Sequence, residues 1–126
     1  IYSFHGYKSH PDTIKTMAES HAFLLLLNHH AKSIISGKIF EYIRGRRPIA
    51  AFVPENGEAA EIIRTTNTGT VCPSDNPLKM KNALAEFYSK WKSSGWNYSP
   101  NRDEIKKFDR KILTGILAGV FEEVVG

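Results

Sequence analysis

Residues 36–52 read SGKIFEYIRGRRPIAAF and carry, in succession, the two kinds of secondary structure that decide the fold. Apolar residues at helical spacing predict a short helix over residues 37–44. Gly45 ends that pattern, and the apolar run PIAAFV at residues 48–53 predicts a strand buried on both faces. A helix that leads into such a strand is typical of a parallel sheet covered by helices on both sides.

Strand and helix signals also alternate along the rest of the chain. The apolar run AFLLLL at residues 22–27 predicts a second strand buried on both faces. Pro11 and Pro77 each stand in the first turn of a helical pattern, where proline is tolerated, and Asn101 with Glu104 resembles a capping box. The other predicted elements are strands at 1–4 and 69–72 and helices at 9–20, 58–66, 75–91 and about 102–125.

These elements predict an α/β fold with a Rossmann-like, doubly wound parallel sheet. Hydrophobic residues make up 41% and charged residues 24% of the chain, as in globular proteins, so we expect residues 1–126 to form a single domain. The first predicted strand has no βα unit before it, and the chain does not begin with Met. We therefore expect that the first βα units of the domain are missing from this sequence.

Charge and cysteine content bear on the setting and the partners. The net charge of +4 favours anionic partners such as phosphates, nucleic acid or an acidic membrane surface, although a solvated basic surface explains it equally well. Cys72 is the single cysteine, so no internal disulfide can form, and a cytoplasmic location is expected. The sequence has no zinc-binding spacing, no Asp-x-Asp and no P-loop, so no metal or other cofactor is expected.

Residues at the start of the helix predicted over 37–44 suggest an anion site. In an open parallel sheet, ligands bind outside the carboxyl ends of the strands, and this helix begins at such an end. Ser36 can cap the helix, Gly37 lets a ligand approach the backbone, and Lys38 adds a positive charge to the free amides of the first turn. Glu41 lies one turn further along the same face and suits the two hydroxyls of a ribose. The spacing predicts a nucleotide site, and ordinary capping beside a solvated acid is the alternative.

Residues 38–76, KIFEYIRGRRPIAAFVPENGEAAEIIRTTNTGTVCPSDN, resemble the donor-binding half of the C-terminal domain in two-domain (GT-B) glycosyltransferases of the retaining, group 1 type. The order and spacing of several short motifs carry the resemblance. The matching residues are Lys38, Glu41, Tyr42, Gly45, Pro48, Glu58, Thr68, Gly69, Pro73 and Asp75. The first thirty residues and the last helix are also similar to that family, so the resemblance covers nearly the whole chain and implies a fragment of a GT-B C-terminal domain.

The resemblance implies a role for individual residues. Glu41 would hold the ribose of the donor nucleotide, and Gly37 and Lys38 would lie beside its diphosphate. The complete set of donor-binding residues expected here is Ser36, Gly37, Lys38, Glu41 and Tyr42, with Gly6, Tyr7 and Lys8 bordering the base. The first acid of the family's Glu-x7-Glu signature falls at Ser33, so the chain departs from that signature, and the candidates to replace it at the donor sugar are His29, His30 and Ser33.

The resemblance further implies a hexosyltransferase that moves a sugar from UDP-sugar or GDP-sugar to a hydroxyl of a glycan or lipid-linked sugar during polysaccharide or glycolipid synthesis. Acceptor-side and catalytic residues would lie in a missing N-terminal domain, so the chain alone is expected to bind donor and not to turn over. Nucleic acid is not an expected partner, and the cytoplasmic face of a membrane is an alternative location. Two other hypotheses remain open: a non-catalytic, flavodoxin-like nucleotide-binding module and a sugar-nucleotide epimerase of the same architecture.

Overall fold

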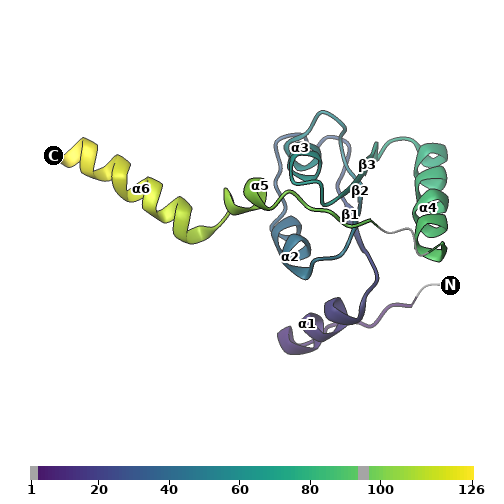
Figure 1. Ribbon diagram of the computed structural model, residues 1–126. Helices are drawn as coiled ribbons and strands as arrows, with labels where there is room; N and C mark the ends of the chain where they lie inside the picture. Colours follow the sequence, from purple (N-terminus) through teal and green to yellow (C-terminus); the bar gives the residue numbers. More distant parts are fainter. Residues whose placement is uncertain (1–2, 94–96) are drawn as a thin grey trace.

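The computed structural model describes residues 3–93 and 97–126, and within these residues it has a three-stranded parallel sheet and six helices (Figure 1). The α/β fold class predicted from the sequence is therefore confirmed. The elements in chain order are α1 (His10–Glu19), β1 (Phe23–Leu26), α2 (Lys38–Gly45), β2 (Ile49–Phe52), α3 (Glu58–Thr65), β3 (Gly69–Cys72), α4 (Pro77–Lys92), α5 (Arg102–Lys106) and α6 (Arg110–Val125).

The sheet has the strand order β1-β2-β3, and both neighbouring pairs are parallel. α2 and α3 lie on one side of it and α4 on the other (Figure 1). Every residue of the central strand β2 is buried, as the apolar run PIAAFV predicted. The core is made by β2 together with the inner faces of α2 and α3, and its residues are Phe23, Leu25, Ile39, Ile43, Ile49, Ala51, Val53, Ala59, Ala60, Ile62 and Ile63.

The prediction that β1 is buried on both faces is wrong. Phe23 and Leu25 are buried, whereas Leu24 and Leu26 are 47% and 60% exposed. β1 is an edge strand, and α4 packs on β2 and β3 rather than on β1. A continuous apolar run predicts a strand but does not say whether both of its faces are covered, because that depends on the neighbouring elements.

Two glycines permit the close packing of this body. A Cβ on Gly69, in β3, would lie 2.0 Å from the carbonyl oxygen of Ile49 in the neighbouring strand. A Cβ on Gly45 would lie 2.5 Å from the Phe23 ring. Gly45 is the last residue of α2 rather than a turn residue, and the left-handed conformation at the end of this helix, with φ of 53°, is taken by Arg46.

The two ends of the chain differ from the prediction. Residues 1–2 of the strand predicted at 1–4 lie outside the described residues, and residues 3–4 are not in a strand. The single helix predicted at about 102–125 is two helices, α5 and α6, because Asp109 caps a new helix by accepting a hydrogen bond from Lys111 N at 2.8 Å. Ile105 and Phe108 pack against the core, but α6 buries no residue and projects away from the body (Figure 1).

Within the described ranges, no helix has the length and apolar character needed to cross a membrane.

Candidate functional site

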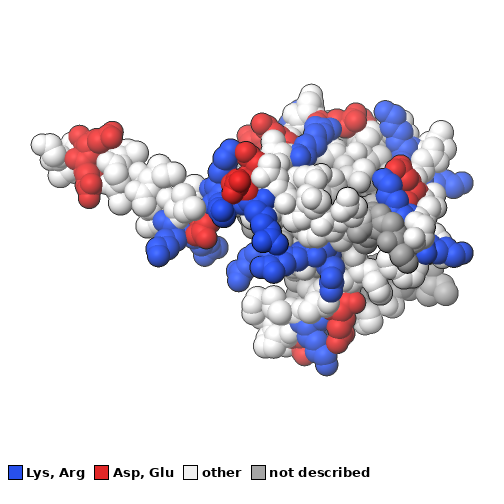
Figure 2. All heavy atoms as spheres, in the orientation of Figure 1, with Lys and Arg blue, Asp and Glu red and all other residues white. Residues whose placement is uncertain are grey.

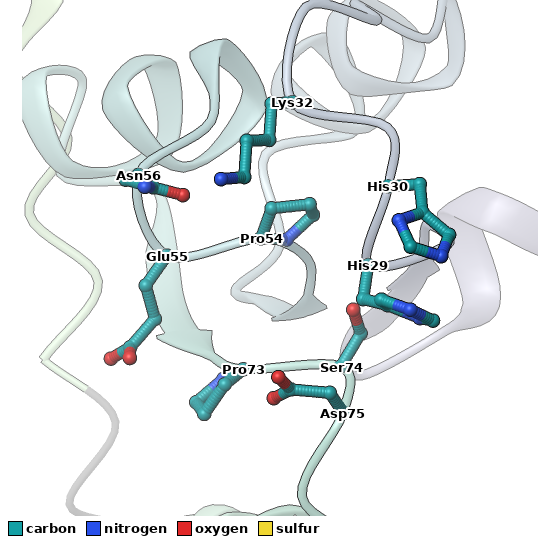
Figure 3. Close-up of a pocket in the computed structure, with 9 residues that line it drawn as sticks. All are labelled: His29, His30, Lys32, Pro54, Glu55, Asn56, Pro73, Ser74 and Asp75. Atoms are coloured by element: carbon teal, nitrogen blue, oxygen red, sulfur yellow. The ribbon is translucent and has the colours of Figure 1, made fainter.

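A hollow lies where the three strands end. Because β1, β2 and β3 are parallel, the loops that follow them leave from the same edge of the sheet. These loops line a cavity of about 510 Å³ (Figure 3). Its lining residues are His29, His30 and Lys32 after β1, Pro54, Glu55 and Asn56 after β2, and Pro73, Ser74 and Asp75 after β3.

Local hydrogen bonds fix the loop that follows β1. Asn28 Oδ1 accepts a hydrogen bond from His30 N at 2.9 Å, which turns the chain directly after the strand. The Lys32 carbonyl then accepts from Glu58 N at 2.9 Å, so this loop is attached to the first residue of α3. A Cβ on Gly57 would lie 3.1 Å from that same carbonyl oxygen, so glycine gives the loop room to approach α3.

The cavity is polar and holds charges of both signs. The imidazoles of His29 and His30 lie side by side with ring centroids 3.8 Å apart. In Figure 3 the Lys32 ammonium extends toward Asn56, while the carboxylates of Glu55 and Asp75 lie on the opposite side of the cavity from it. Such an arrangement offers donors at one side and acceptors at the other, which suits a ligand with several hydroxyl or phosphate groups.

Ser74 presents an unused polar atom to this cavity. Its Oγ is buried and, within the described part of the chain, has no hydrogen-bond partner. A buried hydroxyl without a partner costs free energy, so a bound water or a ligand hydroxyl at this point is favoured.

The start of α2 is a second candidate feature, and none of the residues 36–42 lines the cavity. Ser36 Oγ accepts a hydrogen bond from Lys38 N at 3.3 Å, as expected of a cap. The Lys38 ammonium lies 2.7 Å from a Glu41 carboxylate oxygen, and the two side chains are 54% and 50% exposed. The hydrogen bond to Glu41 and the charge of its carboxylate raise the pKa of Lys38. An ion pair this exposed contributes about 0–1 kcal/mol, so a charged ligand can displace either partner.

The structure brings some of the predicted donor-binding residues together and separates others. Ser36, Gly37, Lys38 and Glu41 share the start of α2. Tyr42 instead packs on the core, where its ring stacks on Phe23 with centroids 4.7 Å apart.

Gly6, Tyr7 and Lys8 precede α1. Tyr7 is 98% exposed, and the Lys8 ammonium donates to Thr16 Oγ1 at 3.0 Å. Among the described residues, no hydrogen bond, ion pair or ring contact joins this segment to α2.

Sequence reasoning missed most of the cavity. His29 and His30 were named only as replacements for a missing acid, and Glu55, Asn56, Ser74 and Asp75 were not named as site residues. A simple signal would have found them, because each lies within four residues after the end of a predicted strand, where ligands of parallel sheets bind.

The described residues hold no group of three His, Cys, Asp or Glu side chains that could bind a metal ion. Cys72 is buried at the end of β3, where burial and the charge of Glu55 raise the pKa of its thiol. The thiol is therefore protonated at neutral pH and suited neither to nucleophilic chemistry nor to metal binding.

Comparison of the chain with protein-family models, with curated proteins and with solved structures found no match.

Proposed function

We propose that this chain is the donor-binding part of a glycosyltransferase that moves a sugar from a nucleoside-diphosphate sugar to an acceptor hydroxyl. The observation that carries the proposal is the polar cavity at the carboxyl ends of three parallel strands. Ligands of open α/β sheets bind at this edge. A volume of about 510 Å³ is within the usual range for small-molecule sites.

The diphosphate would bind at the start of α2. The first-turn amides of Lys38, Ile39 and Phe40 already donate to Ser36 Oγ, Ser36 O and Gly37 O, so the anion would be attracted by the positive end of the helix dipole and by the Lys38 charge. When the exposed ion pair opens, the Lys38 ammonium can turn to the phosphates and the Glu41 carboxylate can accept hydrogen bonds from the ribose hydroxyls. The same cation and helix dipole would stabilise the diphosphate as it leaves the sugar.

The sugar would occupy the polar cavity. Asp75 and Glu55 offer acceptors for its hydroxyls, and the unpartnered Ser74 Oγ can both donate and accept. Asn56 and Lys32 offer donors from the other side. These five side chains would thus take the place of the single acid that the family's signature has at the position of Ser33.

A titration tests the proposal. UDP, GDP and their sugars are added to the chain, and binding is followed by calorimetry or by nuclear magnetic resonance. We expect at least one of them to bind, and we expect Glu41→Ala to weaken that binding by about tenfold or more, because a hydrogen bond to a charged group contributes about 1.5–3 kcal/mol. Glu61→Ala is the matched control, because Glu61 is an exposed acid in the first turn of α3 and is neither in α2 nor among the residues that line the cavity.

Two outcomes contradict the proposal. One is that none of these nucleotides binds at millimolar concentration. The other is that the Glu41→Ala and Asp75→Asn variants both bind with the affinity of the unchanged chain. Binding of the nucleotides with no preference for their sugars would instead favour a nucleotide-binding module without transferase activity.

A further inference from the structure

Basic side chains gather on one face of the body. Lys and Arg atoms cover α5 and α2 on the face drawn in Figure 2, with few acidic atoms between them. Residues 44–47, at the end of α2, and residues 102–107, in and after α5, together hold six bases and two acids. Their net charge of +4 equals that of the whole chain, so the remaining residues are neutral overall. These two segments are called the basic face below.

Two interactions link these segments. Phe40 of α2 lies against Phe108, two residues after the end of α5, with ring centroids 5.4 Å apart. Arg46 interacts electrostatically with Tyr98, which stands four residues before Arg102 at the start of α5. The segments are distant in sequence and therefore form one surface only in the folded chain.

The fold does not favour an arginine at position 46. Arg46 has φ of 53° and ψ of 41°, the left-handed conformation at a helix end in which glycine is preferred. The nearby glycine is needed one residue earlier, because a Cβ on Gly45 would lie 2.5 Å from the Phe23 ring. Arg46 thus holds its charge on a backbone that costs free energy, and residues of this kind are concentrated at functional sites.

Arg102 also stands where the fold does not favour a cation. It is the first residue of α5, and the start of a helix carries a partial positive charge. Arg46, Arg47 and Arg102 are exposed, and in the described part of the chain none of them forms an ion pair. Arg47 Nη2 donates to Ala18 O at 3.2 Å, which uses only part of its five N–H donors. Three arginine charges of the basic face are therefore available to an anion.

We propose that the basic face binds the phosphate groups of an anionic membrane surface. The planar guanidinium of arginine donates two parallel hydrogen bonds to a phosphate, and clusters of bases bind anionic lipid. Neither segment lines the polar cavity, so contact with a membrane leaves the cavity open to its ligand. The choice of a membrane rests on the proposed function, because lipid-linked sugars are among the expected acceptors.

The composition of the basic face favours a membrane over nucleic acid. Single-stranded nucleic acid binds where aromatic rings stack on the bases beside basic groups. Residues 44–47 and 102–107 contain no aromatic residue, and Tyr98 is partly buried. The exposed rings of Tyr88 and Trp91 lie on α4, on the other side of the sheet from α2 (Figure 1). The basic face thus offers charge without a surface for stacking.

Sedimentation with vesicles tests the proposal. The chain is mixed with phosphatidylcholine vesicles that contain or lack phosphatidylglycerol, and the bound fraction is measured. We expect binding to the anionic vesicles alone, and we expect added salt to weaken it. A variant with Arg46→Gly and Arg102→Gln should bind more than about tenfold more weakly, because each base near such a surface contributes roughly fivefold in affinity.

Both substitutions suit the fold. Glycine is preferred at position 46 and a neutral residue at the start of α5, so the midpoint of thermal unfolding should be unchanged or higher. The matched control carries Lys79→Gln and Lys81→Gln, which remove two charges near the start of α4. Because α4 packs on the other side of the sheet, this control should bind vesicles like the unchanged chain.

Three results would overturn the proposal. They are no binding to anionic vesicles at low salt, full binding by the arginine variant, and an equal loss in the lysine control, which would make net charge the cause. An RNA oligonucleotide that binds the chain and displaces it from the vesicles would assign the basic face to nucleic acid instead. Vesicle binding is measured without nucleotide, and nucleotide binding without vesicles, so failure of this proposal is distinguished from failure of the proposed function.

Discussion

α3 and α6 have similar sequence patterns and opposite surroundings. Both carry apolar residues at helical spacing, yet α3 buries Ala59, Ala60, Ile62 and Ile63, whereas α6 buries none. The difference lies in the connections. α3 joins two neighbouring parallel strands, so the chain must cross over one face of the sheet and pack there. α6 does not connect two strands of the described sheet, so its connections do not hold it against a face of that sheet. An amphipathic pattern predicts a helix but does not identify what covers its apolar face.

The sharpest test of this comparison is the same substitution in both helices. Ile63 is 0% exposed and Ile116 is 61% exposed. Ile63→Ala should lower the free energy of unfolding by about 2–5 kcal/mol, because it leaves a cavity in the core. Ile116→Ala should change it by less than about 0.5 kcal/mol, because the Ile116 side chain is exposed and leaves no cavity. Urea unfolding followed by circular dichroism measures both, and equal effects would mean that α6 packs on the body.

A glycine pair should give effects of opposite sign. Gly69→Ala puts a Cβ 2.0 Å from the Ile49 carbonyl oxygen, which the rigid strand cannot avoid, so a loss of about 1–3 kcal/mol is expected. Gly115→Ala meets no atom within 4 Å and should stabilise α6 itself by about 0.5–1 kcal/mol, because alanine favours a helix interior over glycine. Thermal unfolding measures the loss at Gly69, and the helical signal in circular dichroism measures the gain at Gly115, because α6 buries no residue against the sheet. A stabilising Gly69→Ala would contradict the close approach of β2 and β3.

The part of the fold that could be predicted is the part where one short stretch decides the outcome. β2 was predicted as fully buried and is so, because PIAAFV is apolar at every position. The exposure of Leu24 and Leu26 could not be predicted, because it depends on where α4 packs. The break before α6 depends on whether one helix continues through Asp109 or Asp109 caps a new helix. The free energies of these two alternatives differ by a few tenths of a kcal/mol to about 1 kcal/mol.

The candidate site also has a part that local sequence predicted and a part that it did not. Ser36, Lys38 and Glu41 are close in sequence, so helical spacing alone predicted their proximity. Glu55 and Asp75 line one cavity only because β2 and β3 are parallel neighbours that end at the same edge. That relation involves strand order and register, which no local pattern contains. Their positions after predicted strands mark these residues as candidates, but only the fold shows that they line one cavity.

The pH dependence of the free energy of unfolding tests the burial of Cys72. Burial and the charge of Glu55 raise the pKa of this thiol in the folded chain, whereas the unfolded thiol titrates near 9.0. The unfolded state therefore loses its proton first as the pH rises. The free energy of unfolding should fall as the pH passes 9.0 and stop falling once the folded thiol also ionises.

Tyr98 requires a control in that experiment, because burial raises its pKa as well. Cys72→Ala removes the thiol and leaves Tyr98, so the difference between the two chains isolates the contribution of Cys72. We expect the unchanged chain to lose more stability between pH 8 and pH 10 than Cys72→Ala does. Identical pH profiles would mean that the thiol is as accessible in the folded chain as in the unfolded one.

α2 has a buried side and an exposed side within one helix. Substitutions on its exposed side should change the free energy of unfolding least. Ile39 and Ile43 are buried, whereas Lys38 and Glu41 form an ion pair in solvent. A double-mutant cycle with Lys38→Ala and Glu41→Ala should give a coupling energy for folding of about 0.2–1 kcal/mol, since solvent screens the pair. High salt should reduce it further.

The size of that coupling decides whether the start of α2 can serve a ligand. A weak pair can open when a diphosphate arrives, so both substitutions should weaken nucleotide binding far more than they weaken the fold. A coupling of several kcal/mol would make the pair a structural element, and its side chains would then not be free to contact a ligand. Measuring the cycle twice, once by urea unfolding and once by nucleotide titration, separates these two cases on the same four proteins.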